Sequence, residues 1–415
     1  MNLAILGAGG REHALVWKLA QSVPQENIYT LPGNGGIPNS IALDISDFRA
    51  IEQFCREQKI ELVVVGPEAP LVAGVVDYFA DQEIKVFGPS QHAAQLEGSK
   101  IWSKQFMAKY GVATADFWVF EHDTEAAETR IHELEGELVI KFDGLAGGKG
   151  VYVCSSEAEA FAALDDLQRT YGASAKFLIE KKLSGSEISI IGFTDGTHIR
   201  MLMPSQDHKQ LNDGDTGPNT GGMGAYCPPV FYNDALMAGI MDAVVQPTLN
   251  GLQGEQLNYK GIVYFGIMIT DDGPKLLEYN VRLGDPETEV ILPAMKSDLL
   301  QLILSCFDGT LADYTMEYHD GFWVDVVLTS GGYPKSYGKG YEIYGLDQVS
   351  ENSLVFHAGT ALQNGRLVTS GGRVLNIVAH GPDLAATIDS VYQECRKVTF
   401  QDVYYRQDIG KRNFS

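Results

Sequence analysis

The chain has 415 residues and a net charge of −23, from 31 basic and 54 acidic residues. A surface this acidic repels nucleic acid and anionic membranes, so we expect neither as a partner. The length is enough for two to four domains, and 45% of the residues are hydrophobic, as in ordinary globular proteins. Five scattered cysteines without CxxC spacing argue against a disulfide framework or a zinc site and favour the cytoplasm. The sequence begins with a strand and has no long apolar run, so we expect no signal peptide and no membrane segment.

The first hundred residues alternate short apolar strands with helices. We predict strands at 3–6, 62–65 and 86–87 and helices at 48–58 and 72–80. This alternation predicts a small parallel α/β domain over residues 1–99, whose Gly/Pro loops lie beyond the carboxyl ends of the strands, where such sheets bind ligands. Glu68, in one of these loops, is a candidate to hold a ribose hydroxyl; the alternative is a solvated side chain.

A glycine-rich turn at residues 7–10 leads from the first strand into a helix. A strand, a glycine turn and a helix N-terminus together form an anion site, because free backbone N–H groups point at the ligand. The dinucleotide fingerprint G-x-G-x-x-G is incomplete, since Glu12 stands where its third glycine belongs. We therefore predict a monophosphate held by Gly9, Gly10 and Arg11, with a tight turn and a solvated arginine as the alternative.

The stretch VIKFDGLAGGKGVYV at residues 139–153 predicts a strand, a Gly-rich turn and a second strand. Glycines let backbone N–H groups approach an anion, and Lys141 and Lys149 add positive charge, so a polyphosphate is the natural ligand. The stretch is not a P-loop, because Gly150 follows Lys149 where Ser or Thr is required. A hairpin with solvent-facing lysines is the simpler alternative.

Two further features point to a phosphate-bearing ligand. Ser99 is a predicted helix cap, and Lys100 then falls in the first turn, where the helix dipole disfavours a cation unless it faces an anion. Residues 212–226 form a long polar loop rich in Gly, Asp, Asn and Thr, which we predict to be an ordered substrate loop.

A β-hairpin is predicted over residues 262–279, turning at Asp271-Asp272-Gly273. Glu278 and Asn280 lie two residues apart on its second strand and therefore share one face. Two oxygen donors on one face suit Mg²⁺, which takes few protein ligands and adds phosphate oxygens. Arg282 continues this face, which makes a plain exposed strand the weaker interpretation. From residue 322 the pattern changes, and residues 321–415 are predicted to form a separate α+β domain.

Several long motifs together resemble one family, the phosphoribosylamine–glycine ligases (glycinamide ribonucleotide synthetases) of the ATP-grasp superfamily. The motifs are GGREHAL (9–15), VGPEAPLV (65–72), FGPS (87–90), LEGSK (96–100), KFDGLAGGKGV (141–151), SQDHK (205–209), DTGPNTGGMGAY (215–226), EYNVRLGDPE (278–287), GGYP (331–334), FHAGT (356–360) and GGRVL (371–375). The resemblance runs from end to end. Four positions depart from the family pattern: Phe142 and Gly147 stand where Ala is usual, Leu283 where Phe is usual and Glu289 where Gln is common.

The resemblance implies an α/β and α+β architecture: an ATP-grasp fold preceded by a small parallel α/β domain and followed by a small C-terminal domain. The implied boundaries are 1–99, 100–320 and 321–415, with a lid subdomain at about 120–190. ATP would lie between the lobes of the central region, with Mg²⁺ or Mn²⁺ as the metal. We expect a cytoplasmic monomer whose partners are small molecules.

The resemblance also assigns roles to individual residues. The implied nucleotide contacts are Lys100, Lys141, Gly147, Gly148, Lys149, Gly150, Glu180, Lys181, Leu183 and Glu187. The implied metal ligands are Glu278 and Asn280. The implied catalytic residues are Arg282, Lys141, Asp207 and Asp285, with Asp207 or Asp285 receiving an ammonium group. The implied substrate contacts are Gly9, Gly10, Arg11, Glu68, Asn219 and Gly284. His13 and His208 are candidates for proton transfer, with structural histidines as the alternative.

The implied reaction joins glycine to 5-phosphoribosylamine at the expense of ATP, through a glycyl phosphate, and gives glycinamide ribonucleotide, ADP and phosphate in de novo purine biosynthesis. It needs no protein nucleophile, in agreement with the absence of a recognisable Ser–His–Asp or Cys–His motif. The nearest alternative is an ATP-grasp ligase with another acid or amine. A dinucleotide-dependent oxidoreductase and a non-catalytic nucleotide-binding module are the more distant ones.

Overall fold

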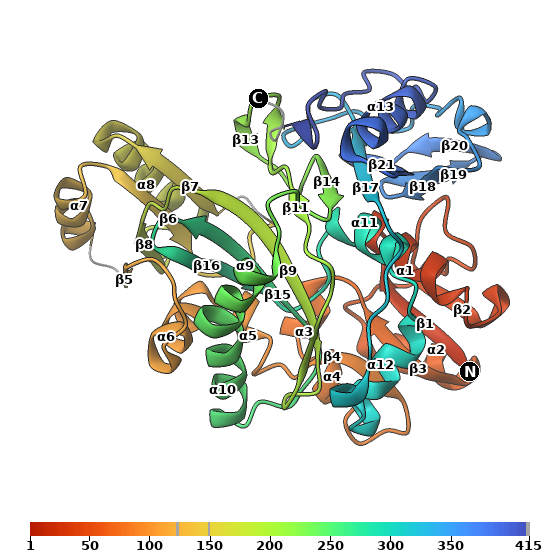
Figure 1. Cartoon of the computed structure of the whole chain (residues 1–415), viewed down its shortest axis with the longest axis horizontal. Coiled ribbons are helices and arrows are strands. Elements are labelled where there is room, and N and C mark those ends of the chain that lie inside the picture. The colour runs from red at the N-terminus through yellow and green to blue at the C-terminus, as the bar shows by residue number, and fades with distance from the viewer. Residues whose placement is uncertain (122–123, 148–149, 412–415) are drawn as a thin grey trace.

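A computed structural model of the chain describes residues 1–121, 124–147 and 150–411. Figure 1 shows a central body flanked on one side by a projecting lid (α7, Thr124–Glu133, and α8, Glu157–Tyr171) and on the other by the N- and C-terminal parts. Within the described ranges, no helix is long and apolar enough to cross a lipid bilayer. All five cysteines are buried free thiols.

The largest sheet has the strand order β10-β9-β15-β4-β3-β1-β2, with β16 paired to β15. Its strands are β1 (Asn2–Gly7), β2 (Ile28–Pro32), β3 (Ile60–Val65), β4 (Lys85–Pro89), β9 (Ser186–Thr194), β10 (Ile199–Met201), β15 (Tyr259–Thr270) and β16 (Gly273–Asn280). β1 to β4 pair in parallel, as predicted, and β4 then pairs antiparallel with β15. The sheet therefore continues from the first ninety residues into the central hairpin.

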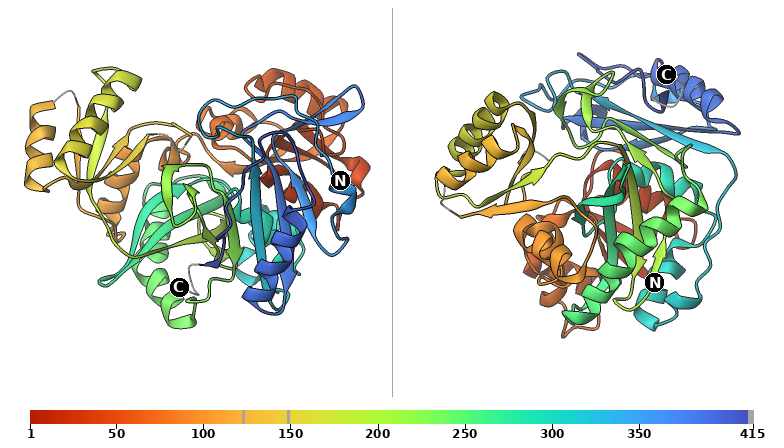
Figure 2. Two further views of the ribbon diagram at one scale, coloured as in Figure 1. Left: turned by 90° about the horizontal axis from the view of Figure 1, so that it is seen from above. Right: turned by 60° about the vertical axis from the view of Figure 1, so that its left-hand side comes forward.

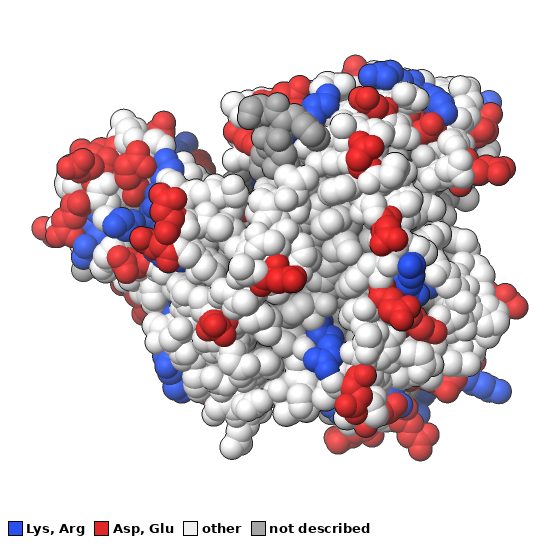
Figure 3. Space-filling view, in the orientation of Figure 1, with Lys and Arg blue, Asp and Glu red and all other residues white. Residues whose placement is uncertain are grey.

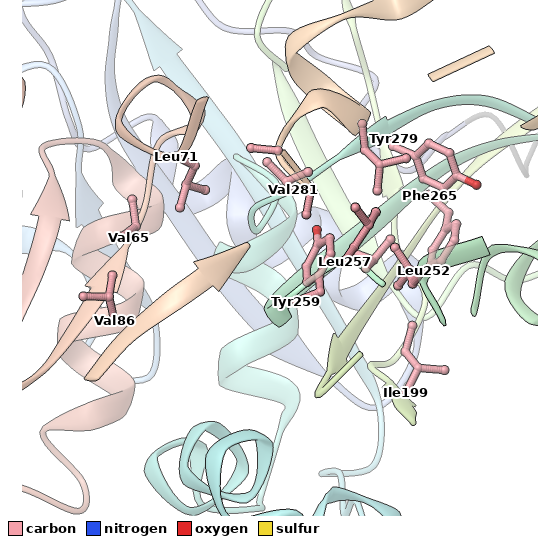
Figure 4. Close-up of a cluster of buried hydrophobic side chains, with 14 of the residues drawn as sticks. Val65, Leu71, Val86, Ile199, Leu252, Leu257, Tyr259, Phe265, Tyr279 and Val281 are labelled. Atoms are coloured by element: carbon pink, nitrogen blue, oxygen red, sulfur yellow. The ribbon is translucent and has the colours of Figure 1, made fainter. Parts of the chain in front are cut away.

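One hydrophobic cluster accompanies this continuity. Figure 4 shows Val65 and Val86 from the parallel strands in the same cluster as Phe265 and Tyr279 from the central hairpin. Burying such side chains away from water stabilises the junction by about 25 cal/mol for each Å² of apolar surface. The loops at the ends of β1 and β3 are thus held firmly against the hairpin that carries Glu278.

The helices of the N-terminal part are α1 (Gly10–Leu19), α2 (Phe48–Glu57), α3 (Glu68–Val72) and α4 (Val75–Tyr78). The single helix expected at 72–80 is wrong. Gly74 adopts φ +92°, a left-handed conformation that interrupts the helix and separates α3 from α4. Glu68 begins α3 instead of lying in a loop.

The lid is built on its own four-stranded sheet, with the order β5-β8-β6-β7. Its strands are β5 (Phe117–Phe120), β6 (Glu137–Phe142), β7 (Val151–Ser155) and β8 (Phe177–Lys181). β6 and β7 pair antiparallel across the glycine-rich turn, which confirms the strand–turn–strand prediction. The views in Figure 2 show this unit standing off the body. In Figure 3 acidic side chains crowd its outer surface, where Glu125, Glu128 and Glu133 of α7 are exposed.

The C-terminal sheet has the order β11-β14-β17-β21-β18. Its strands are β11 (Gln206–Asp207), β14 (Gly224–Cys227), β17 (Phe322–Thr329), β18 (Leu354–His357) and β21 (Arg373–Gly381), and it is covered by α13 (Leu384–Cys395). Two of the five strands thus come from the central region. The expectation of one long loop at 212–226 is therefore wrong: it contains β14 and most of a small hairpin of β12 (Gln210–Asn212) and β13 (Thr216–Asn219).

The remaining α-helices lie between residues 95 and 308. They are α5 (Gln95–Gly98), α6 (Lys100–Tyr110), α9 (Asp234–Ile240), α10 (Gln246–Gly254), α11 (Glu287–Ala294) and α12 (Leu299–Asp308). The predicted cap of α6 is confirmed, because Ser99 Oγ accepts a hydrogen bond from the Trp102 N–H at 3.1 Å. Capping starts the helix at Lys100 and so places this lysine in its first turn.

Two histidines meet where α1 packs against β18. The backbone N–H of His357 donates to His13 Nδ1 at 2.8 Å, and the ring centroids are 5.4 Å apart. Burial and the nearby His357 lower the pKa of His13 to about 3, and burial lowers that of His357 to about 4. Both rings are therefore neutral in the folded protein at neutral pH, and His13 is a structural acceptor in this fold.

This pair predicts a loss of stability in acid. Each ring remains neutral in the folded state while it gains a proton near pH 6.5 in the unfolded chain, so stability present above pH 6.5 is lost as pH falls toward 4 and 3. The slope is at most about 1.4 kcal/mol per pH unit for each histidine. The free energy of unfolding is measured in urea at pH 6.5 and at pH 5. Between these two pH values, His13→Gln should lose up to about 2 kcal/mol less of it than the unsubstituted chain loses. The exposed His132→Gln variant is the control and should lose as much stability as the unsubstituted chain. An equal loss in His13→Gln and in the unsubstituted chain would contradict this prediction.

Candidate active site

A cleft of about 600 Å³ lies where the lid, the central hairpin and the N-terminal part meet. Its lining includes most of the residues predicted from the sequence. They are Arg11, Glu68, Lys100, Lys141, Gly147, Gly150, Glu180, Lys181, Leu183, Glu187, Asp207, Asn219, Glu278, Asn280, Arg282 and Asp285. Residues more than 270 positions apart in the chain thus converge on one site.

Seven predicted residues are not among those lining residues, and two of them are the candidate proton-transfer histidines, His13 and the buried His208. Gly148 and Lys149 lie outside the described residues. Gly9 lines a smaller neighbouring hollow, and Gly10 faces the buried side chains of Glu289 and Asn376. Gly284 packs against the side chain of Glu287, whose carboxylate accepts hydrogen bonds from Ser189 and Tyr264.

Glu278 stands at the end of β16 among cations. Burial alone would raise the pKa of this carboxyl, but Lys209, Lys141, Lys100 and Arg282 together hold it below its usual value. The side chain is therefore ionised, with four positive charges around it. Sequence reasoning missed Lys209, which also forms an ion pair with Glu187 at 2.9 Å. Lys209 belongs to the SQDHK motif and follows β11, and this position was the feature of the sequence that could have indicated its role.

Glu180 joins two buried lysines on one wall of the cleft. Its carboxylate lies 2.9 Å from Lys141 Nζ and 3.1 Å from Lys104 Nζ, and all three side chains are at most 7% exposed. Lys141 also donates to the Leu277 carbonyl at 3.0 Å. Burial lowers the pKa of Lys104 to about 8. The resemblance implies a nucleotide contact at Glu180, and in the structure its side chain fixes the ammonium of Lys141.

Lys100 and the turn after β6 hold each other in place. Lys100 Nζ donates to the Gly144 carbonyl at 3.1 Å. The Asp143 carboxylate accepts from Ser99 Oγ at 2.8 Å and from the Ile101 N–H at 3.0 Å. The base of the glycine-rich turn is therefore tied to the N-terminus of α6, and Lys100 and Lys141 face the same cleft.

Arg282 is held between two carboxylates. Its guanidinium lies 3.4 Å from Glu68 and 3.1 Å from Glu97, and it donates to Asn280 Oδ1 at 3.0 Å. Glu68 therefore orients Arg282. Burial raises the pKa of Glu97 to about 7, although Arg282 opposes this.

The amides at the glycine turn already have carboxylate partners. The Gly9 N–H donates to Glu12 at 2.5 Å, and the Arg11 N–H lies 3.5 Å from Asp285. The Arg11 side chain donates to Glu12 and to the Leu283 carbonyl. Two carboxylates at this helix N-terminus disfavour a phosphate there. Glu12, which replaces the third glycine of the dinucleotide fingerprint, was the feature of the sequence that indicated this arrangement.

Arg373 and Asp285 separate the cleft from a second hollow. The guanidinium lies 3.0 Å from the Asp285 carboxylate, and it also donates to the Gly221 and Asp285 carbonyls. The hollow has a volume of about 300 Å³ and is lined by Ala8, Gly9, Gly33, Asn34, Asp285, Tyr333, Ala358, Gly359, Thr360, Ser370 and Arg373. Arg373 belongs to the GGRVL motif, but no role could be predicted for it, because its partner Asp285 is 88 residues away in the chain.

Glu289 and Asp325 are fully buried behind this pair. Among the described residues, neither oxygen of either carboxyl has a hydrogen-bond donor within reach. Burial, reinforced by Asp285, raises the pKa of both carboxyls well above the usual value. A protonated Glu289 has the shape and the neutral charge of the Gln that is common at this position in the resembling family. Glu289 therefore places at this position a carboxyl whose protonated form is favoured by burial.

The residues on β16 suit a divalent cation that is shared with a ligand. Glu278 is an ionised carboxylate, and Asn280, on the same face, offers a carbonyl oxygen that now accepts from Arg282. The described residues contain no group of three or more His, Cys, Asp or Glu that could hold a metal by themselves. Two protein oxygens plus phosphate oxygens are what Mg²⁺ sites commonly use.

Comparison with known proteins covers the whole chain. The family models for phosphoribosylglycinamide synthetase match residues 1–97 (N domain), 98–288 (ATP-grasp domain) and 323–412 (C domain). The chain is 45% identical to a phosphoribosylamine–glycine ligase of Clostridium acetobutylicum, over 99% of this chain and all of that protein. It is also 45% identical to the human trifunctional purine biosynthetic protein adenosine-3, of which it spans 42%.

Solved structures agree. A phosphoribosylamine–glycine ligase from Thermotoga maritima superposes with a TM-score of 0.84 at 35% identity, over 99% of this chain and all of that chain. A biotin carboxylase domain from Hydrogenobacter thermophilus, solved with MgADP, shares the fold alone, with a TM-score of 0.72 at 15% identity over 97% of this chain and 91% of that chain. The chain belongs to the phosphoribosylglycinamide synthetase family.

Proposed function

We propose that the protein is an ATP-dependent carbon–nitrogen ligase that joins glycine to 5-phosphoribosylamine, giving glycinamide ribonucleotide, ADP and phosphate. The observation that carries this proposal is the ring of cations, Lys100, Lys141, Lys209 and Arg282, around ionised Glu278 in the large cleft. Such a ring neutralises a polyphosphate, and full-length similarity to phosphoribosylamine–glycine ligases supplies the substrates. The alternative is a ligase of the same fold with another acid or amine.

ATP would lie in the large cleft. Lys141 and Lys100 would contact its phosphates, because both ammonium groups line the cleft beside the turn after β6. The strand end at Glu180–Leu183 would form the wall beside adenine, and Glu187 would hold the ribose.

Mg²⁺ or Mn²⁺ would be held by Glu278 and Asn280 together with phosphate oxygens. The bound cation would neutralise charge on the transferring phosphoryl group. The task of Arg282 is to add a fixed positive charge on the same side, since Glu68 and Glu97 hold its guanidinium in place.

The sugar phosphate would enter beside Asp285 and Arg373. The second hollow is bounded by Gly9 and the Gly33–Asn34 loop on one side and by C-terminal loops on the other. Because carboxylates occupy the amides at Gly9 and Arg11, we assign the phosphate to the Arg373 side of this hollow and not to the helix N-terminus. Gly10 and Gly284 would then shape the site through packing.

Glycine would bind between the two pockets. Asp207 lines the cleft, and its buried Oδ1 has no hydrogen-bond partner among the described residues, whereas Asp285 already pairs with Arg373. We therefore favour Asp207 for the glycine ammonium, which would also ionise it by cancelling the burial that raises its pKa. Asn219, on the cleft wall, is a further polar contact for substrate.

The reaction would take two steps. A glycine carboxylate oxygen attacks the γ-phosphorus, the bond to the β-phosphate oxygen breaks, and ADP leaves, which forms glycyl phosphate. The ribosylamine nitrogen then attacks the carbonyl carbon, loses a proton and expels inorganic phosphate. A closed cleft protects the acyl phosphate from water.

We further propose that the protein is cytoplasmic, because its buried cysteines are free thiols. We also propose that it acts as a monomer.

An oxygen-isotope experiment tests this proposal. Glycine labelled with ¹⁸O in its carboxylate is incubated with ATP, Mg²⁺ and freshly generated 5-phosphoribosylamine. One ¹⁸O atom per turnover should appear in inorganic phosphate, because the carboxylate oxygen becomes the bridging oxygen of the acyl phosphate. Turnover with unlabelled phosphate would contradict this route.

A further inference from the structure

Phe142, the last residue of β6, stacks on Tyr171, the last residue of α8. The ring centroids are 3.9 Å apart and the planes differ by 9°, which is the closest ring pair in the described part of the chain. Both rings are partly buried against the lid core.

Two glycines that flank the described part of the turn, Gly144 and Gly150, lie close to the Phe142 side chain. A Cβ at Gly144 would lie 2.9 Å from Phe142 Cε1, and one at Gly150 would lie 3.1 Å from Phe142 Cβ. The Phe142 N–H donates to the Gly150 carbonyl at 2.8 Å. Gly144 has φ +150°, which other residues rarely adopt. The ring thus fills the space that side chains of the turn would need.

The same turn forms part of the cleft wall. Leu145, Ala146, Gly147 and Gly150 line the cleft, and Leu145 is 38% exposed. Lys100 and the cap of α6 hold the turn at Asp143 and Gly144. The stacked rings support it from the lid side. This wall is therefore fixed from both directions before any nucleotide binds.

We propose that the Phe142–Tyr171 stack is a positioning pair that holds residues 143–147 against the nucleotide and so sets the affinity for ATP. This inference rests on the proposed function only in taking ATP as the ligand of the large cleft. Neither ring is among the residues that line the cleft, so the pair acts on binding through the turn and not on the chemical steps. Pre-organising a binding wall raises affinity by lowering the entropy lost on binding.

Calorimetric titration of ATP into the full chain tests the pair. Phe142→Ala and Tyr171→Ala should each raise the Kd for ATP about two- to tenfold, the range expected for losing one aromatic pair. The kcat should stay within about twofold, because the reacting atoms are untouched. The double variant should bind about as weakly as either single variant, since both remove the same stack. Tyr171→Phe should match the unsubstituted chain.

Phe161→Ala is the matched control. Phe161 lies on α8 with Tyr171 and packs against the lid core, but its ring contacts His132, away from the turn. An unchanged Kd in Phe142→Ala and Tyr171→Ala, or an equal rise in Phe161→Ala, would overturn the inference. If Phe142→Ala does not fold, Tyr171→Ala carries the same comparison. Failure of the unsubstituted chain to bind ATP would instead contradict the proposed function.

Discussion

Replacing Glu278 by Ala should reduce turnover on the order of 10²-fold or more while leaving the chain folded. The carboxylate is the ionised centre of four cations, Lys209, Lys141, Lys100 and Arg282, and the proposed metal ligand on β16. Without it, the cations repel one another and the metal loses its charged protein ligand. The measurement is ADP release over a Mg²⁺ titration, with far-UV circular dichroism to confirm folding.

Glu278→Gln separates the two contributions. Gln keeps the volume and one oxygen but loses the charge, so it should be nearly as inactive as Ala and should require more Mg²⁺. Lys275→Ala, at the half-buried start of the same strand, is the control and should behave as the unsubstituted chain. Normal turnover in a folded Glu278→Ala protein at low Mg²⁺ would remove the metal assignment.

Replacing Glu180 by Ala should have the largest effect on stability, about 3–5 kcal/mol. Its carboxylate lies between Lys104 and Lys141, all nearly inaccessible to solvent, so removing it leaves two buried ammonium groups without their anion. The measurement is the free energy of unfolding in urea. Lys104, whose pKa is already about 8, should then lose its proton at still lower pH.

An exposed ion pair gives the comparison. Arg366 lies 2.8 Å from Glu342, but the arginine side chain is 70% exposed. Arg366→Ala should therefore cost less than about 1 kcal/mol, as exposed pairs usually do. Equal losses in Glu180→Ala and Arg366→Ala would show that the triad at Glu180 does not stabilise the fold.

Much of the fold could be predicted because its signals are local. β6, β7 and the turn between them follow from an apolar run, clustered glycines and a second extended run, and the cap at Ser99 fixes the start of α6. The placement of Glu278 and Asn280 on one face followed from strand periodicity alone. Most of the predicted binding residues line one cleft, although their roles stay predictions.

The features that could not be predicted depend on partners far away in the chain. Arg373 pairs with Asp285, and Glu180 pairs with lysines on two other elements, and no local pattern indicates either contact. The 212–226 segment was expected to be a loop, because its strands are short and the partner of β14, strand β17, lies about a hundred residues further along the chain. The glycine turn at residues 7–10 predicts an anion site, but the Gly9 and Arg11 N–H groups already face the carboxylates of Glu12 and Asp285.

The most direct test of the central claim is ADP release from ATP and Mg²⁺ with glycine and freshly generated 5-phosphoribosylamine supplied separately and together. The proposed function assigns separate places to a nucleotide, an ammonium-bearing acid and a sugar phosphate, so full release should require both substrates. Equal release with either one missing, or none with both present, would contradict the proposed ligase and point to another acid or amine.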